Sequence, residues 1–425
     1  MAKRSVCVVG LGYIGLPTAA VLASRGIEVF GADINGTTVA EVAAGRTHMH
    51  EPQLDDLLAD AVRSGLLRAG ARPVVADVYI VAVPTPIRDD HGANLDMVVG
   101  AAQSVAKVLK PGDLVILEST VPPGTTNGIF RETLEGNGCI AGRDFLLAHC
   151  PERVLPGNLL AELIGNDRII GGIDEASTKA AVDVYLTFVR GALIETDATT
   201  AELVKLMENT YRDVNIALAN EFALIAERLG IDVWEAIEHA NRHPRVKYLR
   251  PGPGVGGHCI AVDPWFIVEA APDLARLIST ARSVNDSMPE HVVELARQAV
   301  GDLRGAAITT LGLTYKANVG DLRESPAVTV VTHLRRAGAV VRTHDPLVGT
   351  EEAAEDAVAG ASLLVMLVDH DAYSALDPRE IGPRMRSRVV LDTRGVLDRD
   401  LWEAAGFRVH TLGQAGASVL VGGQD

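Results

Sequence analysis

One cysteine stands in a glycine-rich segment with the composition of an active-site loop. Cys259 lies in the run Pro251-Gly-Pro-Gly-Val-Gly-Gly-His-Cys-Ile-Ala-Val-Asp-Pro264. A thiolate is a strong nucleophile, and a cationic neighbour favours both the thiolate and its oxyanion adducts. Glycine is costly to order, so this loop predicts a backbone that approaches a ligand closely. The alternative is an inert buried thiol, because cysteines are often buried.

A second chemical signal is the dinucleotide-binding fingerprint Gly10-Leu-Gly-Tyr-Ile-Gly15. It lies between an expected strand at residues 5–9 and an expected helix at 16–24, the context in which a pyrophosphate meets a helix N-terminus. Asp33 ends the next expected strand, where it can bind ribose hydroxyls and would repel a 2′-phosphate. The predicted cofactor is therefore NAD. Its predicted contacts are Gly10, Gly12, Tyr13, Ile14, Gly15 and Asp33.

A nicotinamide site combined with a cysteine nucleophile predicts an oxidation that passes through a covalent thioester. Such a route takes an alcohol to an acid rather than only to an aldehyde. Thr85 and Thr120 each follow an apolar run, at strand ends where doubly wound sheets bind ligands. We expect both to contact the cofactor or a water, and we place Thr120 among the catalytic candidates as well. Turns stabilised by proline are the alternative for both segments.

A polar triplet recurs on an expected long helix. Lys205, Asn209 and Arg212 have the spacing i, i+4 and i+7, which places them on one face. Such residues usually face solvent, so the triplet gains meaning only beside Cys259, where Lys205 would be the cationic neighbour. Asp263 could orient Lys205 or accept a proton. His258 is not assigned as the base, because successive side chains of an extended loop point apart.

The elements that must position these residues alternate along the chain. Strand-like and helix-like runs alternate in the first half, which indicates βαβ units and a mostly parallel sheet. The middle of the chain is predicted to be helical, and the alternation of strand-like and helix-like runs then returns. The expected strands are 5–9, 29–33, 74–83, 114–118, 145–149, 306–311, 340–344, 363–368 and 389–391, and the expected helices of the middle are 199–229, 233–240 and 273–300.

This pattern predicts an α/β protein with two Rossmann-like, doubly wound domains joined by a helical core with a long central helix. The predicted boundaries are 1–195 for the NAD-binding domain, 196–300 for the helical domain with the cysteine loop, and 301–425 for the second doubly wound domain.

The composition of the chain excludes several classes of binding partner. The formal net charge of the 425 residues is −16, which argues against a nucleic-acid partner but not against a phosphorylated ligand held by a local basic cluster. The four cysteines are far apart and form no CxxC pair, so neither a disulfide framework nor a metal site is expected. No run of about 20 apolar residues occurs. We therefore expect a cytoplasmic protein without a membrane span.

Together these residues resemble the UDP-sugar 6-dehydrogenases, the family of UDP-glucose and UDP-N-acetylmannosamine dehydrogenases. The resemblance spans nearly the whole chain. Its motifs are Gly10-Leu-Gly-Tyr-Ile-Gly-Leu-Pro17, Val83-Pro-Thr-Pro86, Ser119-Thr-Val-Pro-Pro-Gly-Thr125, Pro151-Glu152, the triplet from Lys205 to Arg212, Gly256-Gly-His-Cys259, Gly312-Leu-Thr-Tyr-Lys316 and Asp321-Leu-Arg-Glu-Ser-Pro-Ala327.

The resemblance implies a role for each catalytic candidate. Cys259 would be the nucleophile, and Lys205 an acid/base that also stabilises the oxyanion. Asn209 would assist at the same oxygen, and Asp263 would support the water that hydrolyses the thioester. Glu152 would lie near the reacting carbon. A homodimer formed through the helical domain is also implied, as is a UDP-binding C-terminal domain.

The resemblance further implies substrate contacts and favours one branch of the family. The segments 149–157, 241–246 and 257–265 look like the branch that acts on UDP-N-acetylmannosamine, and Pro156 stands where UDP-glucose enzymes have a second glutamate. Arg323 would reach the cofactor or the nucleotide, and Arg394 is a further candidate. The implied substrate contacts are Arg153, Val154, Lys205, Asn209, Arg212, His243, Arg245, Gly256, Tyr315 and Lys316.

The implied activity is NAD-dependent, four-electron oxidation of the C6 hydroxyl of a UDP-sugar to a uronic acid, for polysaccharide biosynthesis. UDP-N-acetylmannosamine is the expected substrate, with UDP-N-acetylglucosamine and UDP-glucose as alternatives. Two more distant readings are a two-electron hydroxy-acid dehydrogenase and a non-catalytic nucleotide-binding protein. Arg153, His243 and Arg245 have their own alternative, as surface charges at an interface.

Overall fold

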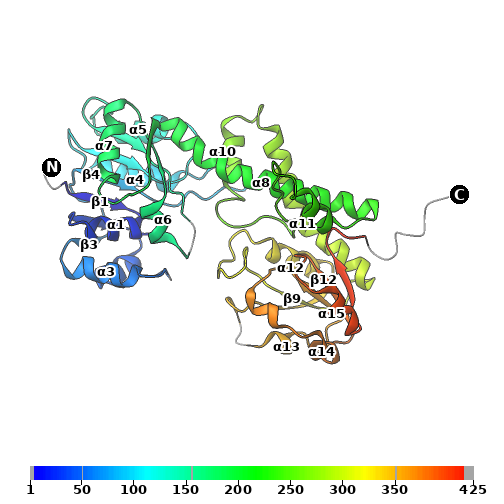
Figure 1. Ribbon diagram of the computed structural model, residues 1–425. Coiled ribbons are helices and arrows are strands. Elements are labelled where there is room, and N and C mark those ends of the chain that lie inside the picture. Colours follow the sequence, from blue (N-terminus) through cyan, green and yellow to red (C-terminus); the bar gives the residue numbers. More distant parts are fainter. Residues whose placement is uncertain (1–3, 50, 155–156, 350–351, 416–425) are drawn as a thin grey trace. The chain divides into compact units, whose positions relative to one another are not determined.

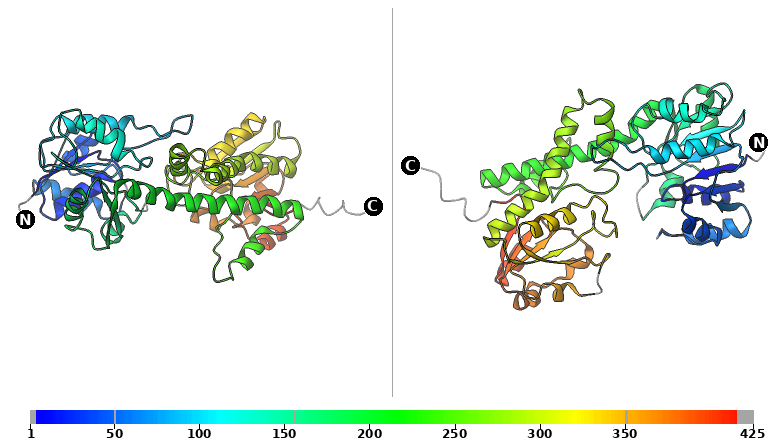
Figure 2. Two further views of the ribbon diagram at one scale, coloured as in Figure 1. Left: turned by 90° about the horizontal axis from the view of Figure 1, so that it is seen from above. Right: turned by 180° about the vertical axis from the view of Figure 1, so that it is seen from behind.

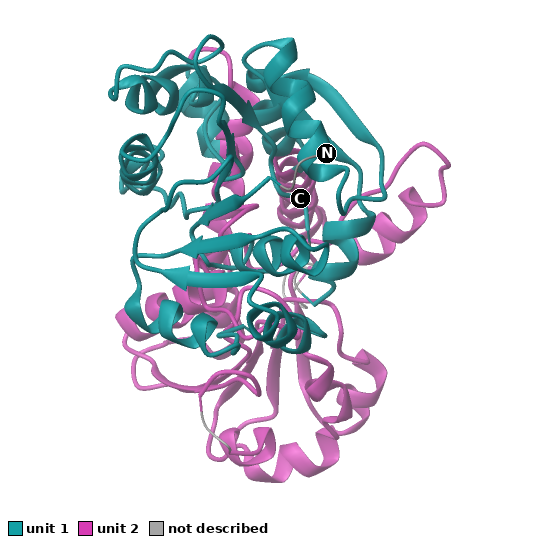
Figure 3. Ribbon diagram, turned by 90° about the vertical axis from the view of Figure 1, so that its left-hand side faces the viewer, with its two compact units in different colours: residues 1–208, 265–272 teal, residues 209–264, 273–425 magenta. Residues whose placement is uncertain are grey.

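The computed structural model describes residues 4–49, 51–154, 157–349 and 352–415. The chain divides into two compact units (Figure 3). Unit 1 consists of residues 1–208 and 265–272, and unit 2 of residues 209–264 and 273–425. The chain therefore passes from one unit to the other at 208/209, 264/265 and 272/273.

Unit 1 contains an eight-stranded sheet with the order β3-β2-β1-β4-β5-β6-β7-β8. Figure 1 labels three of its strands, β1, β3 and β4. Neighbouring strands are parallel except for β6 and β7, which are antiparallel. Several strands are buried along their whole length, as expected for a parallel sheet covered on both faces. The strands are β1 Val6–Val9, β2 Val29–Ala32, β3 Leu67–Gly70, β4 Val78–Val81, β5 Leu114–Leu117, β6 Leu146–His149, β7 Arg168–Gly172 and β8 Leu193–Asp197.

Alternate residues of β1 enter two different cores. Val6 and Val8 pack in a cluster with apolar residues of α1, α3 and α7, whereas Cys7 and Val9 pack in a cluster with α4 and α5. Because successive side chains of a strand point to opposite faces, helices cover both faces of the sheet. The helices are α1 Gly15–Ser24, α2 Gly36–Ala43, α3 Leu54–Arg63, α4 Asp96–Ala106, η1 Thr126–Phe130, α5 Arg131–Glu135, α6 Leu159–Gly165 and α7 Glu175–Tyr185.

Four helices form the middle of the chain, and one of them, α10, follows the cysteine loop and belongs mostly to unit 1. Figure 2 shows the long helix α8, Ala198–Leu229, as one continuous element, and its residues pass from unit 1 to unit 2 at 208/209. The next helix, α9, spans Val233–Ala240, and the carboxylate of Asp232 caps its N-terminus. The others are α10 Asp263–Ala270 and α11 Arg276–Val300.

Unit 2 contains a second sheet, five-stranded and parallel throughout, with the order β10-β9-β11-β12-β13. One face packs on α11 and α12, and the other packs on α13, α14 and α15. The strands are β9 Ala307–Leu311, β10 Val340–His344, β11 Leu363–Met366, β12 Val389–Asp392 and β13 Arg408–Thr411, and the helices are α12 Pro326–Arg336, α13 Ala354–Ala357, η2 Asp371–Ala375, α14 Pro378–Ile381, η3 Gly382–Arg384 and α15 Arg399–Ala404.

The predicted fold class is confirmed: two doubly wound sheets are joined through a long helix. The strand predicted at 74–83 is too long, since only Val78–Val81 pairs and Val74 and Val75 are partly exposed. Strands β3, β7, β8 and β13 were not predicted. Within the described residues, no helix combines the length and apolar character that a membrane crossing needs. The division into three domains remains a prediction.

Candidate active site

The glycines of the fingerprint have different roles. A Cβ on Gly10, whose φ is +95°, would lie 2.5 Å from the carbonyl oxygen of Ala82, and one on Gly15 would lie 1.9 Å from that of Gly10. Close approach of the chain to itself therefore requires both glycines. Gly12 has no atom within 4 Å of such a Cβ, so this glycine leaves open space at the start of α1. That space suits a pyrophosphate.

Asp33 follows β2 and is oriented by two backbone amides. Its Oδ2 accepts from the N–H of Leu11 at 2.8 Å, and its Oδ1 accepts from that of Asn35 at 2.8 Å. The side chain is partly exposed, so its remaining lone pairs can accept from ribose hydroxyls. The residues at the ends of β1 and β2 therefore fit NAD.

The loops after β4 and β5 are joined beside this site. The hydroxyl of Thr85 donates to the carbonyl of Thr120 at 2.6 Å, and that of Ser119 accepts from the N–H of Val83 at 2.9 Å. Both predicted threonines thus lie together at the carboxyl edge of the sheet. Tyr13 belongs to the same region, and its hydroxyl bonds to the buried carboxylate of Glu51.

Glu152 belongs to a buried ionic cluster that sequence reasoning missed. Its Oε2 lies 2.7 Å from Nη2 of Arg168, a close ion pair without the alignment of a hydrogen bond. The other end of this guanidinium lies 4.0 Å from Oε1 of Glu118, which accepts from the hydroxyl of Tyr185 at 2.6 Å. Burial raises the pKa of Glu118 to about 7 although Arg168 opposes the shift. One guanidinium thus serves two carboxyl groups.

Two further polar contacts hold the segment after Glu152. The guanidinium of Arg153 pairs with Glu208 at 2.5 Å, and the N–H of Gly157 donates to Glu51 at 2.9 Å. Val154 packs partly buried against the core of unit 1. Residues 155–156, Pro156 included, lie outside the described residues. The substrate roles of Arg153 and Val154 remain predictions, because Glu208 offsets the charge of Arg153 here.

The cysteine loop lies in unit 2 and is partly exposed at Cys259. The carbonyl of Cys259 accepts from the N–H of Asp263 at 2.8 Å, which closes a turn into α10. A Cβ on Gly256 would lie 2.3 Å from the carbonyl oxygen of Glu324, and one on Gly257 would lie 2.7 Å from the ring of Tyr315. Close packing within unit 2 therefore accounts for these glycines, where we expected the approach of a ligand.

The structure brings two of the predicted catalytic residues into direct contact. Nδ2 of Asn209, on α8, donates to Oδ2 of Asp263 at 2.6 Å, and Asp263 is buried. Lys205 lies one turn earlier on α8 and belongs to unit 1, whereas Asn209, Asp263 and Cys259 belong to unit 2. The pairing of Lys205 with Cys259 remains a prediction.

A buried amide network, also missed from the sequence, supports the start of the cysteine loop. The N–H of Gly252 donates to Asn220 at 2.8 Å, and Asn220 donates to Asn285 of α11 at 2.9 Å. Asn285 in turn donates to Asp213 at 2.8 Å, and Arg282 donates to the same oxygen at 2.6 Å. The only local signal was the i, i+7 spacing of Asp213 and Asn220 on α8.

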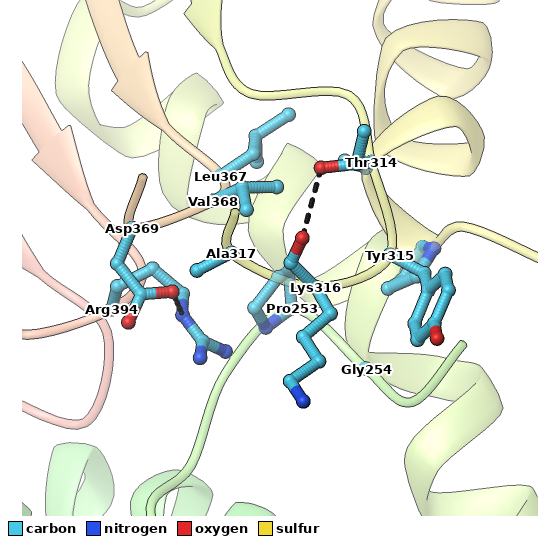
Figure 4. Close-up of a pocket in the computed structure, with 12 residues that line it drawn as sticks. Pro253, Gly254, Thr314, Tyr315, Lys316, Ala317, Leu367, Val368, Asp369 and Arg394 are labelled. Carbon is cyan, nitrogen blue, oxygen red and sulfur yellow. Dashed lines mark hydrogen bonds and ion pairs between the residues drawn. The ribbon is translucent and has the colours of Figure 1, made fainter. Parts of the chain in front are cut away.

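A cavity of about 220 Å³ opens at the carboxyl edge of the second sheet, within unit 2 (Figure 4). In this view Lys316 extends between the side chains of Tyr315 and Arg394. Nε of Arg394 pairs with Asp369 at 3.0 Å. Pro253 and Gly254 of the cysteine loop line the same cavity. The cavity thus holds two cations and the carboxylate of Asp369 beside an aromatic ring. Lys316 and Arg394 are the groups suited to an anionic nucleotide.

Four other predicted contacts are exposed, namely Arg212, His243, Arg245 and Arg323. Arg323 pairs with Asp321 at 2.6 Å. His243 accepts at Nδ1 from the N–H of Arg245 at 3.3 Å, within the loop after α9. Arg212 is exposed on α8. Their roles toward a ligand remain predictions.

The turn after β9 in the second sheet resembles the turn after β1 in the first sheet, but its aspartate is blocked by a neighbouring side chain. Gly312 has a φ of +90°, and Asp345 accepts from the N–H of Leu313 at 2.7 Å, as Asp33 does from Leu11. Here, however, His370 lies 3.0 Å from the same carboxylate oxygen, and Asp345 is buried. Asp345 therefore cannot receive a ribose, which limits this mode of dinucleotide binding to unit 1.

Comparison with protein families covers most of the chain. Residues 4–189 match the NAD binding domain of the UDP-glucose/GDP-mannose dehydrogenase family. Residues 199–287 match its central domain, and residues 309–399 match its UDP binding domain.

Similar proteins share these domains. A UDP-N-acetyl-D-mannosamine dehydrogenase of Methanocaldococcus jannaschii is 48% identical, over 96% of each chain. An NDP-N-acetyl-D-galactosaminuronic acid dehydrogenase of Ralstonia solanacearum is 49% identical, over 92% of this chain and 96% of that protein. Among solved structures, a UDP-D-ManNAc dehydrogenase of Pyrococcus horikoshii superposes with a TM-score of 0.92 at 42% identity, over 96% of this chain and 99% of that one.

Proposed function

The chain belongs to the UDP-glucose/GDP-mannose dehydrogenase family, and on that premise we propose that it oxidises the C6 hydroxyl of UDP-N-acetyl-D-mannosamine to the carboxylate. The oxidation removes four electrons and uses two NAD. The product is UDP-N-acetyl-D-mannosaminuronate. A relative that is 48% identical over 96% of the chain bears the name of this activity, which supports the choice of sugar.

The contact between Asn209 and Asp263 beside the cysteine loop is the observation that best supports the proposed oxidation. Asp263 is buried, accepts from Asn209 at 2.6 Å, and donates its own N–H to the carbonyl of Cys259. One backbone turn therefore joins Asp263 to the nucleophile Cys259, and one side-chain hydrogen bond joins Asp263 to the amide of Asn209. A two-electron dehydrogenase has no need of the thiol in this arrangement.

The cysteine explains how one site performs two oxidations. When bound, NAD accepts a hydride in each oxidation. Lys205 takes the proton of the C6 hydroxyl as the aldehyde forms. The thiolate of Cys259 then adds to the aldehyde carbon, and the resulting C–S bond keeps the intermediate on the protein. Loss of the second hydride leaves a thioester.

Hydrolysis completes the reaction. A water adds to the thioester carbon, the C–S bond breaks, and the sulfur leaves as the thiol or thiolate. We assign support of this water to Asp263, with Thr120 and Glu152 as further polar groups near the reacting carbon. Asn209 and Lys205 stabilise the oxyanion that develops as the water adds. No free aldehyde is released.

The cavity of unit 2 supplies the nucleotide site in this proposal. Lys316 and Arg394 would face the diphosphate, and Tyr315 connects the cavity to Gly257 of the cysteine loop. The match of residues 309–399 to the family's UDP binding domain supports this assignment.

The sugar is tested by counting NADH formed per sugar consumed. We expect two NADH with UDP-N-acetylmannosamine and little turnover of UDP-N-acetylglucosamine or UDP-glucose. UDP-N-acetylgalactosamine joins the panel because of the relative named for N-acetylgalactosaminuronic acid. Turnover of another sugar would keep the mechanism and change the substrate. One NADH per sugar would favour a two-electron dehydrogenase, and no turnover would favour a non-catalytic protein.

The nucleophile is tested by the substitution Cys259→Ser. The first oxidation does not use the thiol, whereas the second requires the thiohemiacetal. We therefore expect the variant to stall before the acid forms, and mass spectrometry of the products checks this. Acid production at the unchanged rate would show that another group captures the aldehyde.

We also propose a cytoplasmic homodimer that supplies an activated uronic acid for polysaccharide biosynthesis. An apolar stripe on α8 supports the dimer: Leu218, Phe222, Ile225 and Leu229 follow one another at i, i+4, i+7 and i+11, and each is at least 38% exposed. Such a stripe usually marks an interface.

A further inference from the structure

The cysteine loop ends on a helix that belongs to the other unit. Cys259 and Asp263 lie in unit 2, and from Trp265 to Pro272 the chain belongs to unit 1. Helix α10 thus begins at Asp263 and continues within unit 1. The C-terminal end of the cysteine loop is therefore continuous in the chain with a helix that packs in unit 1.

A short hairpin of unit 1, residues 87–93, makes these contacts with α10. The ring of His91 stacks on Trp265 with centroids 4.1 Å apart and planes inclined by 9°. The N–H of Ala93 donates to the carboxylate of Glu269 at 2.8 Å, and Arg88 lies 3.7 Å from the same carboxylate. The ion pair is exposed and contributes little, so the stack and the amide bond dominate.

Hydrogen bonds within the hairpin hold His91 in this position. The N–H of Arg88 donates to the carbonyl of Gly92, the N–H of His91 donates to the carbonyl of Arg88, and Nη1 of Arg88 donates to the carbonyl of Ala93 at 2.7 Å. His91 itself has a φ of +63°, a region that side chains other than glycine rarely adopt. Such a conformation persists where surrounding contacts hold it, and the stack on Trp265 is one such contact.

The hairpin is also a direct continuation of the cofactor loop. It follows the segment from Val83 to Pro86, and Thr85 of that segment is bonded to Thr120 at the carboxyl edge of the sheet. The same stretch of backbone therefore runs from the predicted cofactor contacts to the helix on which the cysteine loop ends.

We propose that residues 87–93 are a positioning element for the cysteine loop, acting through His91 and Ala93 on Trp265 and Glu269. This inference rests on the proposed function and extends it. The first oxidation does not use the thiol. The second requires the thiohemiacetal on Cys259 to occupy the place where the substrate hydroxyl was oxidised. Loosening α10 should therefore harm the second oxidation more than the first.

Amide hydrogen exchange tests the positioning without any turnover. His91→Asn keeps a residue that tolerates a positive φ and removes the ring, and Trp265→Leu removes the other ring. We expect exchange in the peptide 256–264 to be about 2- to 10-fold faster in both variants, which corresponds to the loss of one aromatic pair. Trp265→Phe, which keeps an aromatic ring, should restore slow exchange. Asp89→Asn, an exposed change in the same hairpin, is the control.

Product analysis supplies the second readout. His91→Asn and Trp265→Leu should release free aldehyde and lower the yield from two NADH per sugar toward one, while the KM for NAD changes less than about 2-fold. Trp265→Phe should stay near two. Unchanged exchange and unchanged stoichiometry in His91→Asn and Trp265→Leu would overturn the proposal, as would equal effects of Asp89→Asn.

The two proposals fail in different ways. If the unmodified protein yields no NADH with any sugar of the panel, the proposed function fails, and the exchange experiment still decides whether the hairpin restrains the loop. If the unmodified protein yields two NADH and the ring-deleted variants do the same with unchanged exchange, only the positioning role is wrong.

Discussion

At the scale of single residues, burial rather than sequence spacing determines how the acids of unit 1 behave. Glu118 and Glu152 share the guanidinium of Arg168, whose side chain is only 4% exposed. The guanidinium also lies 5.0 Å from the ring centroid of Tyr185. A buried charge of this kind is held by its partners, and removing one partner is costly. Arg168 therefore orients Glu152, the residue that we place near the reacting carbon.

The raised pKa of Glu118 leads to a prediction about stability and pH. Its pKa rises from 4.5 to about 7 in the folded protein, mainly because of burial. The native fold thus favours the protonated acid, so this group's contribution to stability is present below pH 4.5 and is lost as the pH rises through about 7.

Glu118→Gln removes this titration and keeps an acceptor for Tyr185. We expect the stability of the variant relative to the unmodified protein to improve between pH 4.5 and pH 8, by on the order of 2–3 kcal/mol. Thermal melts at both pH values measure the difference. If the difference in stability between the two proteins did not change with pH, ionisation of Glu118 would not destabilise the folded protein.

At the scale of elements, the amide network joins α8 and α11 to the cysteine loop. Asn220 uses both ends of its side chain, accepting from Gly252 and donating to Asn285, and both asparagines are buried. Each of these groups would lack a partner if Asn220 were truncated. The position of the loop's first residues therefore depends on the contact between two helices.

Asn220→Ala should lower the free energy of unfolding by about 2–3 kcal/mol, because buried polar groups lose their partners. Urea unfolding measures this loss. Asn215→Ala is a matched control on the same helix, since Asn215 is partly exposed and donates to the carbonyl of Tyr211 in a solvent-exposed hydrogen bond. We expect the control to change stability by less than about 0.5 kcal/mol. Equal effects of the two substitutions would contradict a supporting role for the network.

At the scale of the whole molecule, the apolar stripe of α8 predicts the oligomeric state. Light scattering should give about twice the chain mass of 44.9 kDa. The double substitution Phe222→Glu with Leu229→Glu places charges in the stripe and should shift the protein to the monomer. Leu186→Glu, at an exposed position outside the stripe, should leave the dimer intact. A monomeric unmodified protein would remove this proposal and leave the proposed chemistry unaffected.

The features that depend on neighbouring residues could be predicted before the fold was known. The turn from β1 to α1, the aspartate after β2, the long helix α8 and both doubly wound sheets were predicted, because each follows from local spacing and periodicity. The glycine-rich cysteine loop was also singled out by its composition, but its role at a ligand stays a prediction, since packing accounts for Gly256 and Gly257. Short or partly exposed strands, such as β3 and β8, carry too weak a pattern to be predicted.

Contacts between polar groups that are distant in the sequence could not be predicted and depend on the fold. Arg168 joins Glu118 and Glu152 across the strands of one sheet, and Asn220 meets Asn285 from a position 65 residues away. The stack of His91 on Trp265 likewise joins a hairpin to a distant helix. A buried polar side chain needs a partner wherever the fold supplies one. No local periodicity records that partner, because long-range packing selects it.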